Sequence, residues 1–398
     1  MKKVAICTPG FLPVPAIHGG AIEHLLTEIL DINEVEKELQ IDLYTIAADG
    51  LSDLSFSSTE IHQIKVNNFE RLLCKILNKL YKIFKINMQA DLFGRKVSKL
   101  LKNKEFDYVL IENNMYVYKT IVSKYKKNTR YLFHLHNDIG GSDKPYWLCR
   151  YISRTSEAVI TCSKYLNYRF SNVTNFKNIQ VLYNSIELNN FRYNVNARAS
   201  LRERWGLQDK DFTFMYVGRI SREKGLYELV NAFKKLAEYY ENISLVVVGD
   251  ASYNGFGINN YYKSIISLAE GCKAQIIFLG KQPNENIPSI MSAADCIVIP
   301  TITEEAFGMV AVEAMACQRP LIVTNSGGLV EVVDEKCALI ADKNNIIDEL
   351  FEKMQMICVD NSIVKNMGLN GYRRVKSIAD FHIANYYMNF INILKSYE

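Results

Sequence analysis

The chain has 398 residues, of which 48% are hydrophobic and 23% are charged, and its net charge is +4. This composition is typical of a globular protein and excludes a long disordered or low-complexity chain, and the length favours two domains. The nine cysteines are irregularly spaced and include no CxxC pair, which indicates reduced core residues in a cytosolic protein and argues against a disulfide framework or a zinc site.

The N-terminal segment MKKVAICTPG contains an apolar run of only four residues. This run is too short for a signal peptide or a membrane span, so we expect a first β-strand here. Further short apolar runs alternate with amphipathic segments along the whole chain, which is typical of βαβ units. The expected strands are residues 3–9, 41–47, 107–113, 130–136, 158–163 and 179–185, then 212–218, 243–249, 274–280, 296–300, 320–324 and 337–341.

This pattern predicts an α/β fold with two doubly wound, Rossmann-like domains. We place the first domain at residues 1–190 and the second at 191–378, joined through a polar linker without periodicity at 187–200. Ligands bind at the carboxyl ends of the strands in such sheets. We therefore expect two domains that face each other across a shared cleft.

The loop after the first expected strand ends in Gly19 and Gly20 directly before a helical segment. Paired glycines at a helix N-terminus allow backbone N–H groups to approach an anion such as a phosphate. The pair lacks the GxGxxG spacing of a dinucleotide site. A plain tight turn is the alternative interpretation.

The segment Arg71–Lys104 carries ten basic residues and a single acid, Asp91. Its first half has apolar residues at helical spacing beside a stripe of lysines, which predicts an amphipathic basic helix over residues 71–86. Such a helix suits an anionic membrane surface. An ordinary helix with its apolar side on the domain core is an equally good interpretation. Nucleic acid is not expected, because the segment lacks interleaved aromatic residues for base stacking.

His134 and His136 lie two residues apart in an expected strand, and His136 is the last residue before the loop NDIGG. That place puts the His136 imidazole at the carboxyl edge of the sheet, where it could donate a hydrogen bond to a phosphate or sugar oxygen. A core histidine with its hydrogen bonds satisfied is the alternative. We do not expect a metal pair, because no carboxylate or cysteine stands nearby at ligand spacing.

The segment GRISREKG follows the strand at 212–218. In it Gly218 allows a turn, Arg219 offers a forked guanidinium and Lys224 a point charge, a combination suited to a diphosphate. The nearby DKD, residues 209–211, precedes the strand, so we interpret it as a polar turn and not as a metal site.

The segment TITEEAFGMVAVEAMACQRP, residues 301–320, places Glu305 in a loop and Glu313 in an apolar, buried helix. A buried carboxylate is costly without a hydrogen-bond partner, and vicinal sugar hydroxyls would be suitable partners. The alternative is that Glu313 pairs with a buried arginine or caps backbone amides, an interpretation that suits one of the two glutamates better than both. Glu304 is expected to be solvated.

Together these segments resemble family 4 retaining glycosyltransferases of the GT-B fold, of the type that builds bacterial surface polysaccharides. The strongest part is EAFGMVAVE, which matches the E-x7-E motif of the family at Glu305 and Glu313, followed by AMACQRP and SGGLVEVV in the expected order. GRISREKG matches the Arg and Lys element on the donor diphosphate. Weaker matches are the Gly20 loop, the strand end at His136, AVITCSKYL and YNSIELNNF.

The resemblance implies transfer of a hexosyl or N-acetylhexosaminyl group from a nucleotide-diphosphate sugar, with UDP preferred because it is common in the family. The acceptor is expected to be a lipid-linked saccharide in polysaccharide, lipopolysaccharide or capsule biosynthesis. The family needs no metal and no cofactor besides the donor. The expected location is the cytoplasm, peripheral at the inner face of the cell membrane.

The resemblance also assigns roles to residues. Arg219 and Lys224 would hold the pyrophosphate and stabilise the charge that develops on it. Glu313 would bind the ribose hydroxyls and Glu305 the hydroxyls of the donor sugar. The implied catalytic residues are Glu305, Arg219, Lys224 and His136, and the implied donor-binding set is Gly20, Gly218, Arg219, Lys224, Glu305, Phe307, Gly308, Met309, Val310 and Glu313.

In the first domain, the resemblance places Gly20 near the phosphate and His136 near the transferred sugar. A terminal helix at 379–398 would pack back on that domain. The chain departs from common family patterns at Gln318, where relatives carry a small residue or glycine, and at Asn184-Ser185, where many have Asn-Gly. We expect Gln318 to affect packing and Ser185 to make a left-handed turn costlier.

Two other classes of function remain open. A sugar-nucleotide epimerase on the same fold would convert the donor with no acceptor present, and a phosphorylase would need a pyridoxal-phosphate lysine that no motif marks. A catalytically silent sugar-nucleotide-binding or assembly protein is the third possibility, and the intact Arg/Lys and Glu/Glu pairs argue against it.

Overall fold

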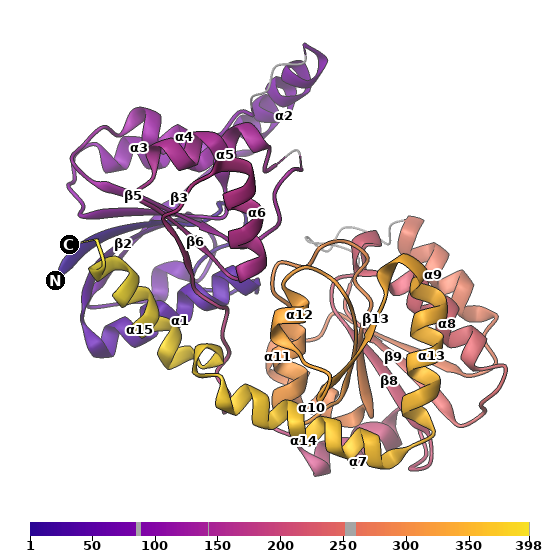
Figure 1. Cartoon of the computed structure of the whole chain (residues 1–398). Coiled ribbons are helices and arrows are strands. Elements are labelled where there is room, and N and C mark those ends of the chain that lie inside the picture. Colours follow the sequence, from indigo (N-terminus) through magenta and orange to yellow (C-terminus); the bar gives the residue numbers. More distant parts are fainter. Residues whose placement is uncertain (85–88, 142, 251–259, 398) are drawn as a thin grey trace. The chain divides into compact units, whose positions relative to one another are not determined.

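The computed structural model describes all residues except 85–88, 142, 251–259 and 398. It divides into two compact units, which we call unit 1 (Met1–Tyr183 with Ala384–Glu398) and unit 2 (Asn184–Ile383) (Figure 1). The division lies seven residues before the expected boundary at 190, so the start of the expected linker belongs to unit 2. The last part of the chain returns to unit 1.

Unit 1 contains a parallel sheet of seven strands in the order β3-β2-β1-β4-β5-β6-β7. All six strands expected from the first half of the sequence are present. The additional strand, β3, has the sequence TEIHQI, in which polar residues are too frequent for an apolar-run search. The strands are β1 (Lys2–Cys7), β2 (Leu39–Ile46), β3 (Thr59–Ile64), β4 (Tyr108–Glu112), β5 (Arg130–Leu135), β6 (Ala158–Thr161) and β7 (Ile179–Val181).

Helices cover both faces of this sheet, with α3, α4 and α5 on one side and α1 and α15 on the other (Figure 1). The expected terminal helix at 379–398 is divided into a short 3-10 turn at Ala379–Phe381 and the helix α15. Helix α15 packs on unit 1, where the Tyr387 hydroxyl donates to Asn33 Oδ1 at 2.8 Å and Tyr108 donates to the Leu394 carbonyl at 2.7 Å. The helices of unit 1 are α1 (Ala21–Glu36), α2 (Asn68–Ile83), α3 (Leu92–Leu101), α4 (Met115–Lys124), α5 (Tyr146–Thr155), α6 (Lys164–Thr174) and α15 (Ile383–Lys395).

Unit 2 contains a parallel sheet of six strands in the order β10-β9-β8-β11-β12-β13, and all six were expected. The strands alternate with helices, so that α8 and α13 lie on one side of the sheet and α11 and α12 on the other (Figure 1). The elements are α7 (Val195–Arg204), β8 (Phe212–Val217), α8 (Leu226–Leu236), β9 (Ile243–Val248), α9 (Asn260–Glu270), β10 (Gln275–Gly280), α10 (Ile287–Ala293), β11 (Cys296–Ile299), α11 (Met309–Ala316), β12 (Leu321–Thr324), α12 (Leu329–Val332), β13 (Ala338–Ala341), α13 (Ile346–Cys358) and α14 (Asn361–Ser377).

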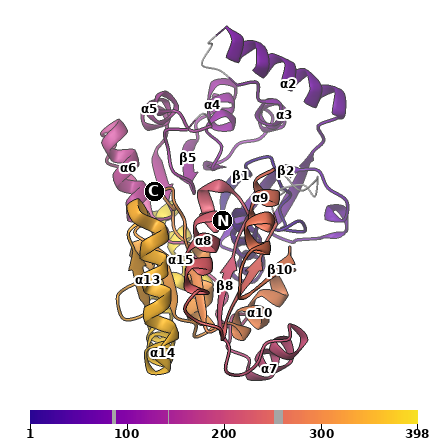
Figure 2. The same ribbon diagram turned by 90° about the vertical axis from the view of Figure 1, so that its right-hand side faces the viewer.

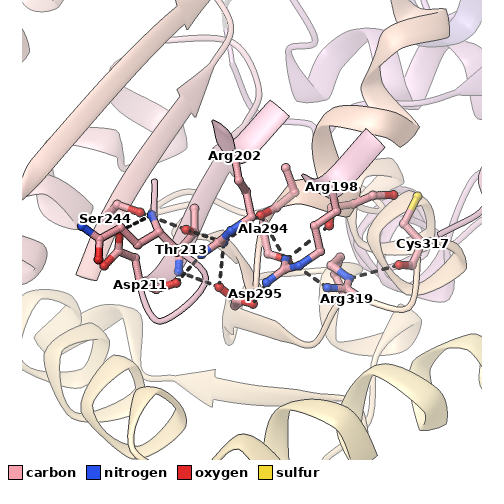
Figure 3. Close-up of polar contacts among 12 residues, drawn as sticks. Arg198, Arg202, Asp211, Thr213, Ser244, Ala294, Asp295, Cys317 and Arg319 are labelled. Atoms are coloured by element: carbon pink, nitrogen blue, oxygen red, sulfur yellow. Dashed lines mark hydrogen bonds and ion pairs between the residues drawn. The ribbon is translucent and has the colours of Figure 1, made fainter. Parts of the chain in front are cut away.

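Helix α7 occupies the end of the segment that we expected to be a linker, because a network of arginines anchors it to the sheet (Figure 3). The Arg202 side chain is 2% exposed and donates to Asp295 Oδ2 at 3.2 Å and to Thr213 Oγ1 at 2.8 Å. Arg198 donates to the other Asp295 oxygen at 2.6 Å. Thr213 is the second residue of β8 and Asp295 directly precedes β11. This network therefore fixes the amino edge of the sheet, which is opposite to the edge where ligands bind in such folds. Residues 209–211 form the expected polar turn between α7 and β8.

Gln318 ends α11 in the left-handed backbone conformation, with φ 57°. Its N–H donates to the Met315 carbonyl at 3.0 Å, and the Arg319 N–H donates to the Ala314 carbonyl at 2.9 Å. This pair of hydrogen bonds is the Schellman arrangement, in which glycine is the favoured residue. Our expectation at Asn184-Ser185 was wrong, because neither residue is among the positive-φ residues of the described chain.

Candidate functional site

The carboxyl ends of β8 and β11 bring two loops of unit 2 together. The first loop is the GRISREKG segment, and the second is residues 300–308. Gly225 makes this approach possible, since it has φ 70° and a Cβ built on it would lie 1.8 Å from the Pro300 carbonyl oxygen. The Ile302 N–H then donates to the Glu223 carbonyl at 3.0 Å. A side chain at position 225 would separate the two loops.

Lys224 and Glu305 meet where these loops join. Lys224 Nζ lies 2.5 Å from Glu305 Oε2, and the Thr301 hydroxyl donates to the same oxygen at 3.3 Å. The two charged side chains are 29% and 19% exposed, so the pair is accessible from solvent at the carboxyl edge of the sheet. Our sequence reasoning had assigned these residues to different parts of a donor and did not predict that they pair with each other.

The backbone of Glu305 is fixed by the SGG segment that follows β12. The Glu305 N–H donates to Ser326 Oγ at 2.9 Å, and its carbonyl accepts from the Gly328 N–H at 2.7 Å. A Cβ on Gly327 would lie 2.3 Å from that carbonyl oxygen. Glycine at 327 therefore permits the close contact that holds the loop.

Arg219 lies directly after Gly218 at the end of β8. Its guanidinium Nη2 lies 2.7 Å from Glu223 Oε1, and both side chains are 40% exposed. The Tyr216 hydroxyl donates to the Arg219 carbonyl at 2.7 Å and so fixes the backbone of the turn. Since an exposed ion pair contributes only ~0–1 kcal/mol, the guanidinium can exchange Glu223 for an anionic ligand at little cost.

The start of α11 closes this edge of unit 2. Gly308 caps the helix with φ 108° and supplies no capping side chain, while Met309 and Val310 in the first turn are partly exposed. Phe307, in contrast, is 2% exposed and packs edge-on against Phe381 with ring centroids 5.8 Å apart. The Phe307 side chain therefore belongs to the core, and any contribution that this residue makes to a ligand comes from its backbone.

Glu313 lies on α11, partly exposed, without a hydrogen bond or ion pair to any residue that the structure describes. Removal from water raises the pKa of its carboxyl to about 7. The alternative that Glu313 pairs with a buried arginine is thus wrong for the described chain. A carboxyl that is partly removed from water and has no partner among the described residues is a candidate for contact with a ligand hydroxyl.

Glu304 is exposed, as we expected, but the sequence did not predict its ion-pair partner. Its carboxylate forms an ion pair with Lys343 Nζ. Lys343 follows β13, so this pair connects the loop that holds Glu305 to the next strand end. The pair adds a further charged group to the carboxyl edge of the sheet.

In unit 1, Gly20 caps α1 with φ 106°, as a phosphate-binding turn requires. The position is already filled by a carboxylate, because a Cβ on Gly20 would lie 2.1 Å from Glu23 Oε2. Glu23 is buried, and its pKa is raised by burial and by the nearby charge of Glu112. A phosphate that approaches Gly20 would need Glu23 to turn away or to be protonated.

His136 lies at the end of β5, as expected, and is buried. Its Nε2 lies 3.0 Å from Glu112 Oε2, and His134 Nδ1 lies 3.2 Å from the same oxygen. We had dismissed a metal pair at these histidines because the sequence showed no carboxylate close by. The structure supplies one, Glu112, from the neighbouring strand β4.

Glu112, His134 and His136 thus form one of two groups with metal-ligand chemistry among the described residues. The second group is Asp42, Glu60 and His62, and there Lys104 Nζ already supplies the cation, 2.5 Å from Asp42 Oδ2 and 2.8 Å from Glu60 Oε2. In the first group the short N···O distances are those of imidazole N–H donors to a carboxylate.

Helix α2 is the amphipathic basic helix that the sequence predicted, and it extends away from the sheet of unit 1 (Figure 2). It has no buried residue. Polar atoms on one edge attach it to the domain. Asn78 Oδ1 accepts from the Ala90 N–H at 2.7 Å, and Glu70 pairs with Lys96 at 2.7 Å. Residues 85–88 of the expected basic segment lie outside the described residues.

The apolar stripe of α2 faces away from the domain core. Our alternative, that this stripe packs on the core, is wrong, because every large apolar residue of the stripe is more than 40% exposed. These residues are Phe69, Leu72, Leu73, Ile76, Leu77, Leu80, Ile83 and Phe84. Arg71, Lys75, Lys79 and Lys82 are exposed beside them. None of the helices in the described chain is both long and apolar enough to cross a membrane.

Comparison with known proteins shows which proteins this chain is similar to. Residues 197–374 match the family model of glycosyl transferases group 1. A protein of Bacillus subtilis (strain 168) named as a candidate glycosyltransferase, YtcC, is 24% identical over 395 residues, which cover 96% of this chain and 89% of that protein. The lipopolysaccharide 1,2-N-acetylglucosaminetransferase of Salmonella typhimurium (strain LT2) is 29% identical over 234 residues, 58% of each chain.

Among solved structures, Anabaena Alr3699/HepE in complex with UDP and glucose superposes with a TM-score of 0.75 at 19% identity, over the full length of both chains. This likeness shows the fold. The two parallel, Rossmann-like sheets of this chain are those of the GT-B fold, as the sequence predicted.

Proposed function

We propose that this chain, whose residues 197–374 match the family model of glycosyl transferases group 1, is a retaining glycosyltransferase that uses a nucleotide-diphosphate sugar. We further propose UDP as the nucleotide, a hexosyl or N-acetylhexosaminyl group as the transferred sugar, and a lipid-linked saccharide as the acceptor. The product would enter a bacterial surface polysaccharide, lipopolysaccharide or capsule.

One observation carries the proposal, namely the contact between Lys224 and Glu305 at the carboxyl edge of the unit 2 sheet. A cation and a carboxylate that neutralise each other in the free protein are the two groups that a sugar diphosphate can separate. Its phosphates would take Lys224, and its sugar hydroxyls would donate to Glu305. The nearby Arg219 would add a second cation on the phosphates.

Glu313 supports the same assignment. Its carboxyl has no partner among the residues that the structure describes, and its pKa is raised. The two ribose hydroxyls of a nucleotide would donate to it and replace the water that it has lost. Gly218 and the backbone at 307–310 would line the space between the ribose and the diphosphate. These roles need no metal or cofactor, because Arg219 and Lys224 supply the positive charge.

The proposed reaction forms a bond from the acceptor oxygen to the sugar C1 while the bond from C1 to the diphosphate oxygen breaks. The acceptor attacks from the side of the leaving group, which retains the configuration at C1. The acceptor proton passes to a diphosphate oxygen, and the two cations stabilise the negative charge that develops there. His136 would lie near the transferred sugar, on the unit 1 side.

The surface of α2 supports a lipid-linked acceptor. A helix attached through its polar edge leaves an apolar stripe and a flanking row of four basic residues exposed. That arrangement fits the interface of an anionic bilayer, where the stripe enters the acyl boundary and the lysines meet the headgroups. We therefore propose that the enzyme works in the cytoplasm at the inner face of the membrane. Nucleic acid has no place in this proposal.

The test uses a panel of UDP, GDP, ADP and TDP and their common sugar conjugates. Thermal shift identifies the nucleotide, and NMR of the product identifies the anomeric configuration. We expect one nucleotide to stabilise the protein and the product to keep the configuration of the donor. An inverted product would overturn the retaining assignment.

The same assay separates the alternative functions. Conversion of the donor sugar with no acceptor present would indicate an epimerase. Nucleotide binding without release of the nucleoside diphosphate in a single turnover, with any acceptor lipid, would indicate a silent binding protein. Either result would overturn the transferase proposal.

A further inference from the structure

Glu112 is the last residue of β4 and lies opposite His134 in the register of β4 and β5. Its side chain is 1% exposed. His136 directly follows β5, two residues after His134, and the ring centroids of the two histidines lie 3.8 Å apart. One buried carboxylate therefore contacts two adjacent imidazoles at the carboxyl edge of the unit 1 sheet.

His136 is held at two points. Its backbone N–H donates to Asn113 Oδ1 at 3.1 Å, and its ring Nε2 lies 3.0 Å from Glu112 Oε2. Asn113 itself is buried, adopts φ 49°, and donates its N–H to the His134 carbonyl at 2.7 Å. The backbone and the ring of His136 are thus fixed by two consecutive residues at the end of β4.

The charge on Glu112 follows from its surroundings. Burial alone would raise the pKa of this carboxyl, but the two imidazoles hold it at about 2. Other titratable groups that face it are Cys7 on β1, Glu23 on α1 and Tyr386 on α15. The first and last have pKa values raised by burial, and the pKa of Glu23 is raised as well. Glu112 is therefore ionised at neutral pH and acts as a hydrogen-bond acceptor for both rings.

We propose that Glu112 is a positioning residue that fixes the ring orientation of His136 and keeps a proton on its Nε2. The neutral ring then has its lone pair on Nδ1, the nitrogen turned away from Glu112. Such control of a tautomer by a carboxylate is how an imidazole is prepared for a defined hydrogen bond. The inference rests on the proposed function in that it takes His136 as the residue at the transferred sugar.

The first readout needs no substrate. The wild-type chain is labelled with ¹⁵N-histidine, and its six histidines are assigned by single substitutions. We expect the His136 signals of a neutral ring protonated on Nε2, and we expect them to change in E112Q, whose amide can accept through one oxygen only and carries no charge. A His136 ring protonated on Nδ1 in the wild type would overturn the proposal.

The second readout is kinetic. In E112Q we expect kcat to fall by at least about 10-fold, the lower end of the cost measured for carboxylates that orient metal-bound imidazoles, while KM for the donor stays unchanged. Loss of the negative charge changes the electrostatic surroundings of both imidazoles, so we expect the pH–rate profile of E112Q to differ from that of the wild type. E112D keeps the charge and should recover part of kcat. E105Q, on an exposed glutamate of the same unit, is the matched control.

Two outcomes contradict the role of Glu112 without touching the wider function. E112Q with wild-type kcat, pH profile and ring signals would mean that the contact is structural only. One equivalent of a divalent metal in the purified chain, lost in both E112Q and H134N, would mean that a metal and not protons joins these three side chains. If instead no donor is turned over by the wild type, the proposed function fails while the NMR result on His136 still decides this inference.

Discussion

Lys224 Nζ lies 2.5 Å from Glu305 Oε2, although 81 residues separate them in the chain. Each residue comes from a loop at the carboxyl end of a central strand of unit 2, and Gly225 allows the two loops to touch. In this contact the two charges neutralise each other. A sugar diphosphate would separate them, because its phosphates would bind Lys224 and its sugar hydroxyls would donate to Glu305. We propose that both residues belong to the donor site.

Replacement of Lys224 by methionine removes the cation and keeps most of the apolar stem. We expect K224M to bind the nucleotide sugar about 10- to 100-fold more weakly, since a hydrogen bond to a charged group contributes about 1.5–3 kcal/mol. Isothermal titration measures the change. K210M is the control, because Lys210 is exposed and precedes β8 at the opposite edge of the sheet. An equal loss of donor affinity in K224M and K210M would mean that Lys224 does not contact the donor.

Glu313 makes stability depend on pH. Its pKa is about 7 in the folded chain against an ordinary value of 4.5. Between these values the folded chain binds a proton that the unfolded chain has lost, so the free energy of unfolding falls as the pH rises from about 4.5 to 7 and is then constant. We expect thermal denaturation of E313Q to lack this fall. A parallel decline in both proteins would assign it to other groups.

Donor binding should have the opposite dependence on pH. The ribose hydroxyls need an ionised Glu313 carboxylate as acceptor, so affinity should rise between pH 6 and 8, and binding at pH 7 should release a proton. Titration in two buffers of different ionisation enthalpy detects this release. E313Q should show none. No difference between buffers for the wild type would remove Glu313 from the ribose site.

Gly225 permits the approach of the two loops, so alanine there should be damaging. The new Cβ would lie 1.8 Å from the Pro300 carbonyl oxygen. Gly206 is an unusually close control, since it has φ 71° against 70° for Gly225 and nothing lies within 4 Å of its Cβ position. We expect G225A to lose about 1–3 kcal/mol more unfolding free energy than G206A and to lose donor binding, as measured by chemical denaturation and titration. Equal losses would show that the backbone strain alone is responsible.

The sequence predicted the two sheets well, because their strands are buried on both faces and read as uninterrupted apolar runs. It failed where neighbours distant in the chain decide the outcome. The strand TEIHQI is stabilised by pairing with β2, and α7 is stabilised by Arg198 and Arg202 at Asp295. Single-residue patterns do not contain such contacts.

The candidate site shows the same division. The motifs predicted Lys224 and Glu305 as site residues, but the contact between the two depends on loop geometry, which the motifs do not contain. The carboxylate of Glu112 reaches His136 only because β4 and β5 are adjacent. The left-handed helix end at Gln318 could have been predicted from the sequence, because relatives carry a small residue or glycine there and glycine is the usual residue where a helix ends in a left-handed turn.

Gln318 offers a test of that explanation. Replacement of Gln318 by glycine (Q318G) relieves the strain of the left-handed backbone. It should raise the free energy of unfolding by about 0.5–1 kcal/mol, as measured by chemical denaturation. Donor affinity should not change, because the residue lies at the far end of α11 from Gly308. Q318A, which keeps the strain, should show no gain. Equal stabilisation by glycine and alanine would mean that the glutamine side chain, and not its backbone, is unfavourable.

The exposed stripe of α2 predicts binding to anionic vesicles. At low salt we expect the chain to float with vesicles that contain phosphatidylglycerol and not with pure phosphatidylcholine. K75A/K79A should lower the partition coefficient by roughly 30-fold, at about 1 kcal/mol per lysine, and I76E should also reduce it. K126A/K210A is the control, because both lysines are exposed and lie outside α2.

A wild-type chain that stays with the unbound protein at low salt would exclude the membrane as the partner of α2. A molar mass in solution that halves in I76E would instead indicate a second copy of the chain on this surface. Both results are distinguishable from loss of folding by circular dichroism of the variants.

The most direct test of the account is titration of the best nucleotide sugar of the panel into R219A and E305A, with K210A and E335A as controls at exposed residues of the same unit. We predict that R219A and E305A each bind at least about 10-fold more weakly, as expected for the loss of a charge-assisted hydrogen bond, and that both controls bind as the wild type does. Unchanged affinity in R219A and E305A would contradict the donor site proposed at the carboxyl edge of unit 2.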